Sequence, residues 1–187
     1  QLEHLIKNGY NILAAVTAPD KPSGRGKKIS SSAVKTTALQ FGIPLLQPEK
    51  LKNEAFLSEL ESYKADIFIV IAFRMLPEVV WKMPALGTFN LHASLLPQYR
   101  GAAPINRAIM NGETITGLTT FLINEEIDAG TILLQQEMKI GPNENAGELH
   151  DRMLEEGKKL VVDTIELFEN KKHITNNQVD KRQTVEV

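Results

Sequence analysis

The apolar run at residues 65–73 constrains the fold of this chain more than any other segment. Its sequence, ADIFIVIAF, contains almost no polar side chains. Such a run is typical of a parallel strand buried on both faces, because helices then cover the sheet from both sides. We therefore expect a parallel α/β sheet built around this strand.

Strands and helices alternate along the rest of the chain, which implies right-handed crossovers between parallel strands. In such sheets, ligands bind beyond the carboxyl ends of the strands. The expected strands are 11–16, 65–73, 88–92, 117–123 and 131–140. The expected helices are a first one ending near Gly9, then 33–41, 51–63, 77–83, 103–110 and 146–170. Residues 18–32, rich in Pro, Gly, Lys and Arg, predict a surface loop.

Composition excludes several classes of site. The formal net charge of -2 is not that of a strongly basic nucleic-acid binder, so any RNA contact has to come from a local patch. The chain has no cysteine, hence no disulfide, thiolate metal ligand or cysteine nucleophile, and four scattered histidines give no metal-ligand spacing. No apolar run is long enough to span a bilayer. We expect a cytoplasmic protein without membrane contact or bound metal.

Asn90 and His92 carry the clearest chemical signal. They lie two residues apart on an expected strand, so their side chains share one face of the sheet, and Leu91 points to the other. An amide and an imidazole can both donate to a developing oxyanion. By themselves, the two residues are better explained as a hydrogen-bonded strand end and a turn former.

Two loops add further candidates. Residues 94–104, SLLPQYRGAAP, offer Ser94 and backbone N–H groups for a polar ligand and Arg100 for an anion or carbonyl, although residues 95–97 can also simply cap the core. Residues 124–130, NEEIDAG, offer a carboxylate that can orient and charge a histidine. Most isolated acidic loops are only solvated.

Taken together, residues 89–97 (FNLHASLLP), 99–101 (YRG) and 128–130 (DAG) resemble the formyltetrahydrofolate-dependent formyltransferases. Within this family, residues 101–105 (GAAPI) and the basic segment 19–28 (PDKPSGRGKK) are similar to the methionyl-tRNA formyltransferases. The resemblance covers nearly the whole chain. It implies a Rossmann-like, parallel, mixed-edge sheet of the formyltransferase type.

The resemblance also implies roles for individual residues. Asn90, His92 and Asp128 are the implied catalytic residues in transfer of a formyl group from 10-formyltetrahydrofolate to the amino group of methionyl-initiator tRNA, without a metal. Asn90 and protonated His92 stabilise the oxyanion, and Asp128 keeps His92 charged. The implied folate contacts are Phe73, Arg74, Met75, Leu76, Ser94, Leu95, Leu96, Pro97 and Asn124. The implied contacts to tRNA and its aminoacyl end are Arg25, Lys27, Lys28, Arg100 and Gly101.

The chain also departs from the family pattern. The family's opening strand, near the centre of the sheet, is absent, which predicts open strand edges and an unstable or inactive fragment. We expect a monomeric catalytic domain at residues 1–175 and, at residues 176–187, the start of a linker to an absent tRNA-binding domain. Arg74 stands in a turn that is shorter than the family's usual one.

Three other functions are compatible with parts of this pattern. A formyltransferase acting on a sugar-nucleotide amine would use the same three residues, but the basic segment 19–28 argues against it. Glycinamide ribonucleotide formyltransferase is favoured only by chain length. A non-catalytic folate-binding or RNA-binding module on the same scaffold is disfavoured by the intact Asn90, His92 and Asp128.

Overall fold

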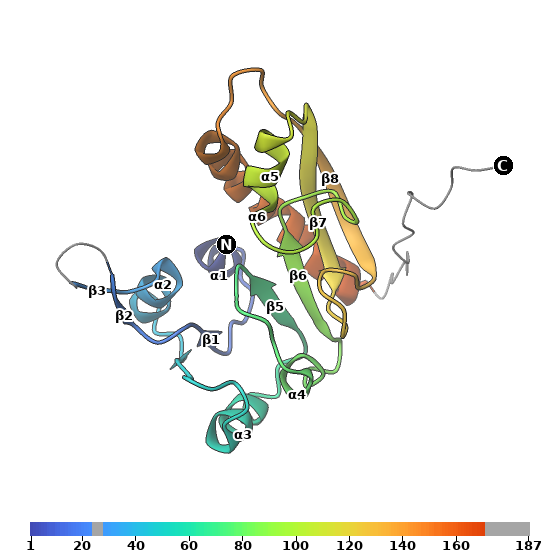
Figure 1. The fold of residues 1–187 in the computed structure, drawn as a ribbon. Helices are drawn as coiled ribbons and strands as arrows, with labels where there is room; N and C mark the ends of the chain where they lie inside the picture. Colours follow the sequence, from blue (N-terminus) through green and yellow to red (C-terminus); the bar gives the residue numbers. More distant parts are fainter. Residues whose placement is uncertain (24–27, 171–187) are drawn as a thin grey trace. The chain divides into compact units, whose positions relative to one another are not determined.

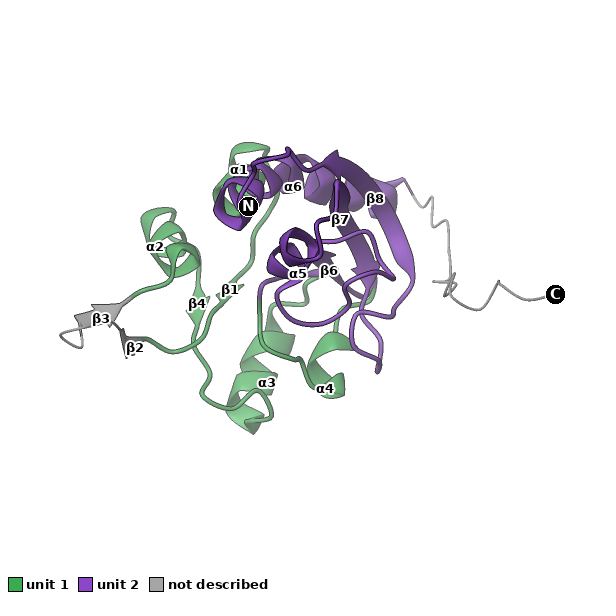
Figure 2. Cartoon of the chain, turned by 45° about the horizontal axis from the view of Figure 1, so that its top comes forward, with its two compact units in different colours: residues 1–66, 73–85 green, residues 67–72, 86–187 purple. Residues whose placement is uncertain are grey.

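The computed structural model describes residues 1–23 and 28–170. They divide into two compact units, coloured separately in Figure 2. Unit 1 consists of Gln1–Asp66 and Phe73–Ala85, and unit 2 consists of Ile67–Ala72 and the chain from Leu86 onward. The linker predicted at residues 176–187 lies outside the described residues.

Unit 1 contains four helices and two pairs of short strands among its described residues (Figure 1). The elements are α1 (Leu2–Lys7), β1 (Ala15–Val16), β2 (Lys21–Ser23), β3 (Lys28–Ser30), α2 (Ala33–Gln40), β4 (Leu45–Leu46), α3 (Glu54–Ser62) and α4 (Glu78–Trp81). β1 pairs in parallel with β4, and β2 pairs antiparallel with β3.

Local sequence explains where these helices begin and end. Gly9 and Gly42 adopt positive φ values of 82° and 66° directly after α1 and α2, as the glycine signals predict. The side-chain oxygen of Asn53 accepts a hydrogen bond from the Phe56 N–H at 3.1 Å. This cap starts α3 at Glu54, three residues later than the helix predicted from residue 51.

The described residues of unit 2 form a four-stranded sheet with two helices. Its elements are β5 (Phe68–Ile71), β6 (Thr88–His92), α5 (Pro104–Met110), β7 (Ile115–Leu122), β8 (Ile132–Lys139) and α6 (Ala146–Glu169). The strand order is β5-β6-β7-β8. β5 and β6 are parallel, whereas β6–β7 and β7–β8 are antiparallel, so the sheet is mixed.

The core of unit 2 lies between the sheet and α6, which packs against β7 and β8. Phe89 stacks on Phe168 of α6 with ring centroids 6.0 Å apart, and Leu91 packs against the same core. Because side chains alternate along a strand, Asn90 and His92 lie on the face of β6 that points away from α6. The face of β6 toward α6 therefore belongs to the core, and the opposite face carries the candidate catalytic residues Asn90 and His92.

Several sequence predictions were wrong in detail. The expected loop at residues 18–32 contains the β2–β3 hairpin, whose arms are too short to show an alternating pattern. β4 was not predicted, because two leucines carry no strand signal of their own. β5 is shorter than the predicted strand and only Val70 in it is buried, since β5 forms an edge of its sheet. The strand predicted at residues 88–92 is confirmed at both ends.

β1 and β5 each lie at an edge of their sheet. Among the described residues, β1 pairs only with β4, and β5 pairs only with β6. Each of these strands therefore has one edge without a hydrogen-bonded neighbouring strand.

We expect Asn145→Ala to lower the free energy of unfolding by about 1 kcal/mol. The Asn145 side chain accepts hydrogen bonds from Gly147 N and Glu148 N, and the Glu148 carboxylate accepts one from the Asn145 N–H, which forms a capping box at the start of α6. Urea unfolding measures the loss. Asn143→Ala, in the exposed loop before the helix, is the control, and an equal loss in both variants would contradict a specific role for the cap.

Candidate active site

His92, the last residue of β6, is held between two acceptors. Its Nδ1 lies 3.6 Å from Asp128 Oδ2, and its Nε2 lies 3.0 Å from the Tyr99 carbonyl oxygen. A carbonyl oxygen can only accept, so Nε2 carries a hydrogen. The Asp128 carboxylate is the acidic group that faces the other ring nitrogen, Nδ1, at 3.6 Å.

Asp128 is fixed by the loop that holds Tyr99. The Gly101 N–H donates to Asp128 Oδ2 at 2.7 Å, and this same oxygen faces His92. The Asp128 backbone is left-handed, with φ of 50°, a conformation that aspartate tolerates better than most residues. Its side chain is 18% exposed. The carboxylate is thus oriented toward His92 from a partly buried position.

The loop that carries Asp128 follows an antiparallel β7, whereas the sequence pattern indicates a parallel sheet. A parallel β7 would have placed the loop after residue 123 at the same edge as His92. β7 is antiparallel, and Leu122 lies opposite Phe89, so this loop starts at the far end of β6. It then returns about 10 Å, the length of three strand residues, to bring Asp128 to His92.

Asn90 lies on the same face of β6 as His92 and is half-buried. Among the described residues, no hydrogen bond is found to its side-chain amide. A half-buried amide without an internal partner is available to a ligand. Within unit 2, the structure therefore places Asn90 on the same face of β6 as His92, and Asp128 beside the His92 ring.

Ser94 and Leu96 are buried, and their hydrogen bonds fix the loop after β6. Ser94 is fully buried, and its hydroxyl donates to the Gln98 carbonyl at 2.6 Å. The buried Thr119 hydroxyl donates to the Ser94 carbonyl and accepts from the Leu96 N–H, and Gln135 donates to the Leu96 carbonyl. The Ser94 hydroxyl, predicted to hold a ligand, is thus used within the loop.

The remaining candidates of unit 2 differ in accessibility. Leu95 and Pro97 are partly exposed, and Asn124 is exposed and accepts a hydrogen bond from the Glu126 N–H at 3.0 Å. Arg100 is half-buried, and its carbonyl accepts from the Arg107 guanidinium at 2.9 Å. Gly101, predicted to contact the aminoacyl end, uses its N–H on Asp128.

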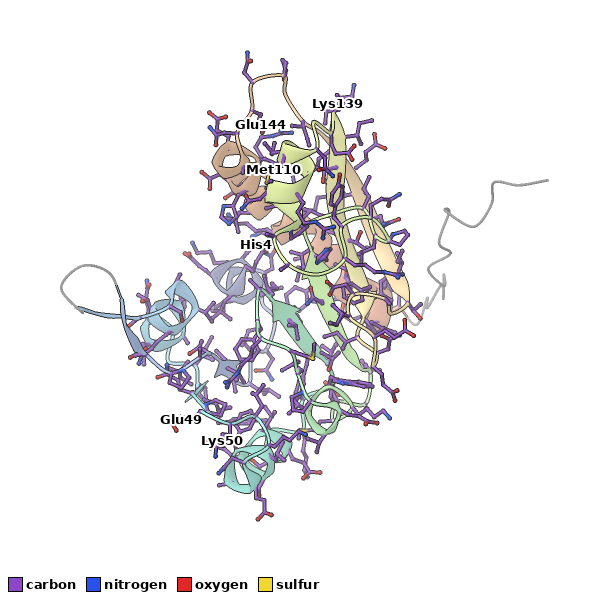
Figure 3. The ribbon with its side chains drawn as sticks, viewed as in Figure 1. His4, Glu49, Lys50, Met110, Lys139 and Glu144 are labelled. Carbon is purple, nitrogen blue, oxygen red and sulfur yellow. The ribbon has the colours of Figure 1, made fainter. Side chains whose placement is uncertain are left out.

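The candidate folate residues Phe73–Leu76 belong to unit 1. The Arg74 guanidinium lies over the Phe73 ring and donates to the carbonyls of Glu49 and Pro48, at 2.9 Å and 2.5 Å. Glu49, which is labelled in Figure 3, lies in the segment before α3. Arg74 thereby ties the turn to the segment before α3. An open hollow of about 530 Å³ is lined here by Lys50, Leu51, Lys52, Arg74, Met75, Leu76, Pro77 and Glu78.

The predicted tRNA contacts Arg25 and Lys27 lie outside the described residues, and Lys28 begins β3. The base of this hairpin is anchored by Lys35, whose ammonium lies 2.6 Å from Asp20 Oδ2 and 2.8 Å from Gln47 Oε1. The hydrogen bond from Lys35 lowers the pKa of Asp20. The start of the basic segment, at Asp20, is therefore held by Lys35 of α2 within unit 1.

Sequence reasoning missed Tyr99, Thr119 and Gln135, which position the site through hydrogen bonds to or from main-chain groups. Within residues 1–23 and 28–170, no helix combines the length and apolar character needed to cross a membrane. No cluster of three or more acidic, His or Cys side chains suited to a metal ion occurs in the same ranges.

A family model described as "Formyl transferase" matches residues 1–165. Methionyl-tRNA formyltransferase of Flavobacterium johnsoniae is 58% identical over 179 residues, which are 96% of this chain and 57% of that protein. The same enzyme of Bacteroides thetaiotaomicron is 56% identical over 90% of this chain and 52% of that protein. This chain thus spans little more than half the length of these relatives.

Solved structures of other formyltransferases share the fold. The phosphoribosylglycinamide formyltransferase of Bacillus halodurans matches with a TM-score of 0.78 and 17% identity, over 92% of this chain and 91% of that one. A sugar 3N-formyl transferase matches with a TM-score of 0.72 and 21% identity, over 98% of this chain and 63% of that one. At such identities the likeness extends to the fold alone.

We expect Gly130→Ala to destabilise the loop that carries Asp128. A Cβ atom at this position would lie 1.6 Å from the Leu122 carbonyl oxygen, so the backbone has to move. Overpacking of this kind costs about 1–3 kcal/mol, measured as a lower midpoint of urea unfolding. Gly141→Ala is the control, since its nearest contact would be an ordinary 3.5 Å to Glu144. Unchanged stability of Gly130→Ala would contradict the close approach.

Proposed function

Because this chain belongs to the formyl transferase family, we propose that it transfers a formyl group from 10-formyltetrahydrofolate to the amino group of methionyl-initiator tRNA. The observation that carries the proposal is the meeting of Asn90, His92 and Asp128 on one side of the unit 2 sheet. The choice of acceptor rests on relatives that are 53–58% identical and are named methionyl-tRNA formyltransferase.

The proposed reaction begins when the methionyl amine attacks the formyl carbon. A carbon–nitrogen bond forms, and the formyl oxygen becomes an oxyanion. The Asn90 amide can donate to this oxygen directly, because no described residue occupies it. His92 can donate only by exchanging one of its present acceptors, Asp128 or the Tyr99 carbonyl. Stabilisation of such an oxyanion is typically a large contribution to catalysis.

The intermediate then collapses to products. A proton leaves the attacking nitrogen and another reaches N10 of the folate, so that the bond between N10 and the formyl carbon breaks. Asp128, held by Gly101 and facing His92, is placed to keep the ring charged and to assist the proton transfer. The products are formylmethionyl-tRNA and tetrahydrofolate. No metal has a role, because the protonated folate amine is already a workable leaving group.

The same proposal assigns the substrate contacts. In unit 2, Leu95, Pro97 and Asn124 border the folate, with Ser94 and Leu96 shaping the loop from inside. Arg25, Lys27 and Lys28 contact phosphates of the acceptor stem, and Arg100 lies toward the aminoacyl end. We further propose a cytoplasmic monomer with its catalytic domain at residues 1–175. The family match over residues 1–165 supports this extent.

We expect His92→Ala to lower kcat/KM for formyl transfer to methionyl-initiator tRNA by about 10²–10⁴-fold, the usual contribution of a positioned acid or base. The assay uses the natural full-length protein with 10-formyltetrahydrofolate. His150→Ala is the matched control, because His150 also lies beside an aspartate, Asp151, but is exposed on α6. Full activity of His92→Ala would contradict the proposed mechanism.

A second prediction concerns the acceptor. Arg25→Ala combined with Lys27→Ala should weaken tRNA binding and reduce the slope of log affinity against log salt by about one per lost phosphate contact. Fluorescence anisotropy at several salt concentrations measures both. Lys139→Ala, on the exposed surface of β8, is the control. Salt-independent binding in all variants, with formyl transfer to a small amine, would move the proposal to the sugar-amine or glycinamide ribonucleotide enzymes.

A further inference from the structure

The main chain of Tyr99 holds His92 on the side opposite Asp128. The Tyr99 carbonyl oxygen accepts the hydrogen of His92 Nε2 at 3.0 Å. To present this oxygen, Tyr99 adopts a left-handed backbone with φ of 58°. A bulky residue rarely takes this conformation and keeps it only when its surroundings fix it. Something other than local preference must therefore maintain the orientation of the carbonyl.

The side chain of Tyr99 provides that anchor. Its hydroxyl donates a short hydrogen bond to Glu113 Oε1 and accepts one from Asn111 Nδ2 at 2.9 Å. The Arg107 guanidinium lies 5.2 Å from the centre of the ring and also donates to the carbonyl of Arg100. These three partners belong to α5 and the turn that follows it. The ring is thus fixed to an element outside its own loop.

The chemistry of this anchor keeps the phenol a donor. Burial, followed by the hydrogen bond to Glu113, raises the pKa of Tyr99 above its usual value of 10.0. The hydroxyl therefore remains protonated at any pH near neutrality and continues to donate to the carboxylate. Replacing tyrosine by phenylalanine would remove both hydrogen bonds of the hydroxyl but preserve the contact between the ring and Arg107.

We propose that Tyr99 is a positioning residue for His92, and that Glu113 and Asn111 act through it. The hydroxyl, held by the α5 turn, fixes the left-handed backbone that points the Tyr99 carbonyl at Nε2. Two residues further on, Gly101 fixes Asp128 on the other side of the ring. One short loop, anchored at its tyrosine, therefore sets both acceptors of the imidazole. The proposal rests on formyl transfer as the function, but the placement of the ring can be tested without it.

The test is Tyr99→Phe in the natural full-length protein, read out in two ways. The first is the exchange of the His92 Nε2 hydrogen with water, followed by NMR of ¹⁵N-histidine-labelled protein. Freed from a fixed carbonyl, this hydrogen should exchange about tenfold faster. The second is formyl transfer, in which kcat should fall by roughly 10- to 100-fold with little change in KM, as expected for a misplacement of about 1 Å.

Matched variants separate positioning from general stability. Glu113→Gln retains an acceptor oxygen and should preserve most of the wild-type exchange rate and kcat, whereas Glu113→Ala should resemble Tyr99→Phe. Tyr63→Phe, at the end of α3, is the control for loss of a hydroxyl. Unchanged Nε2 exchange in a folded Tyr99→Phe variant would overturn the proposal. Fast exchange in a protein that never transfers formyl groups would support the positioning and refute the proposed function instead.

Discussion

The imidazole of His92 depends on two acceptors that come from different parts of unit 2. One is a carboxylate from the loop between β7 and β8, and the other is a main-chain carbonyl from the loop after β6. The two loops are joined by the hydrogen bond from Gly101 to Asp128. Moving either loop would therefore disturb the orientation of the ring. The rest of the unit can be understood as support for this arrangement.

Hydrogen bonds of Thr119 on β7 attach the loop after β6 to the sheet. His92 pairs with Thr119 on β7, and the Thr119 hydroxyl is buried and bonded to both the Ser94 carbonyl and the Leu96 N–H. The loop is thus fastened to the strand beside its own origin. On the other face, Phe89 and Leu91 pack toward α6. The register of β6 is set by this packing, since a shift by one residue would turn Asn90 and His92 toward the apolar core beside α6 and turn Phe89 away from it.

Sequence reasoning recovered the parts of this site that depend on side-chain pattern. The strand at residues 88–92, the shared face of Asn90 and His92 and the opposite direction of Leu91 all follow from alternation. The contribution of the Tyr99 carbonyl could not be foreseen, because every residue has a carbonyl and its direction depends on a left-handed backbone that tyrosine rarely adopts. The direction of β7 was also hidden, since β7 is buried along most of its length and lacks the alternating exposure of a half-solvated antiparallel strand.

The loop between β7 and β8 has an inner part that is fixed by contacts and an outer part that is exposed to solvent. Its inner part is tied down at Asp128 and at Gly130, which lies against the backbone of Leu122. Residues 124–127 are exposed, and neither of these two contacts involves them. Insertions and substitutions there can alter the outline of the loop while the Asp128 carboxylate keeps its position. A scaffold of this kind can change which ligand groups the loop borders without moving the carboxylate that faces His92.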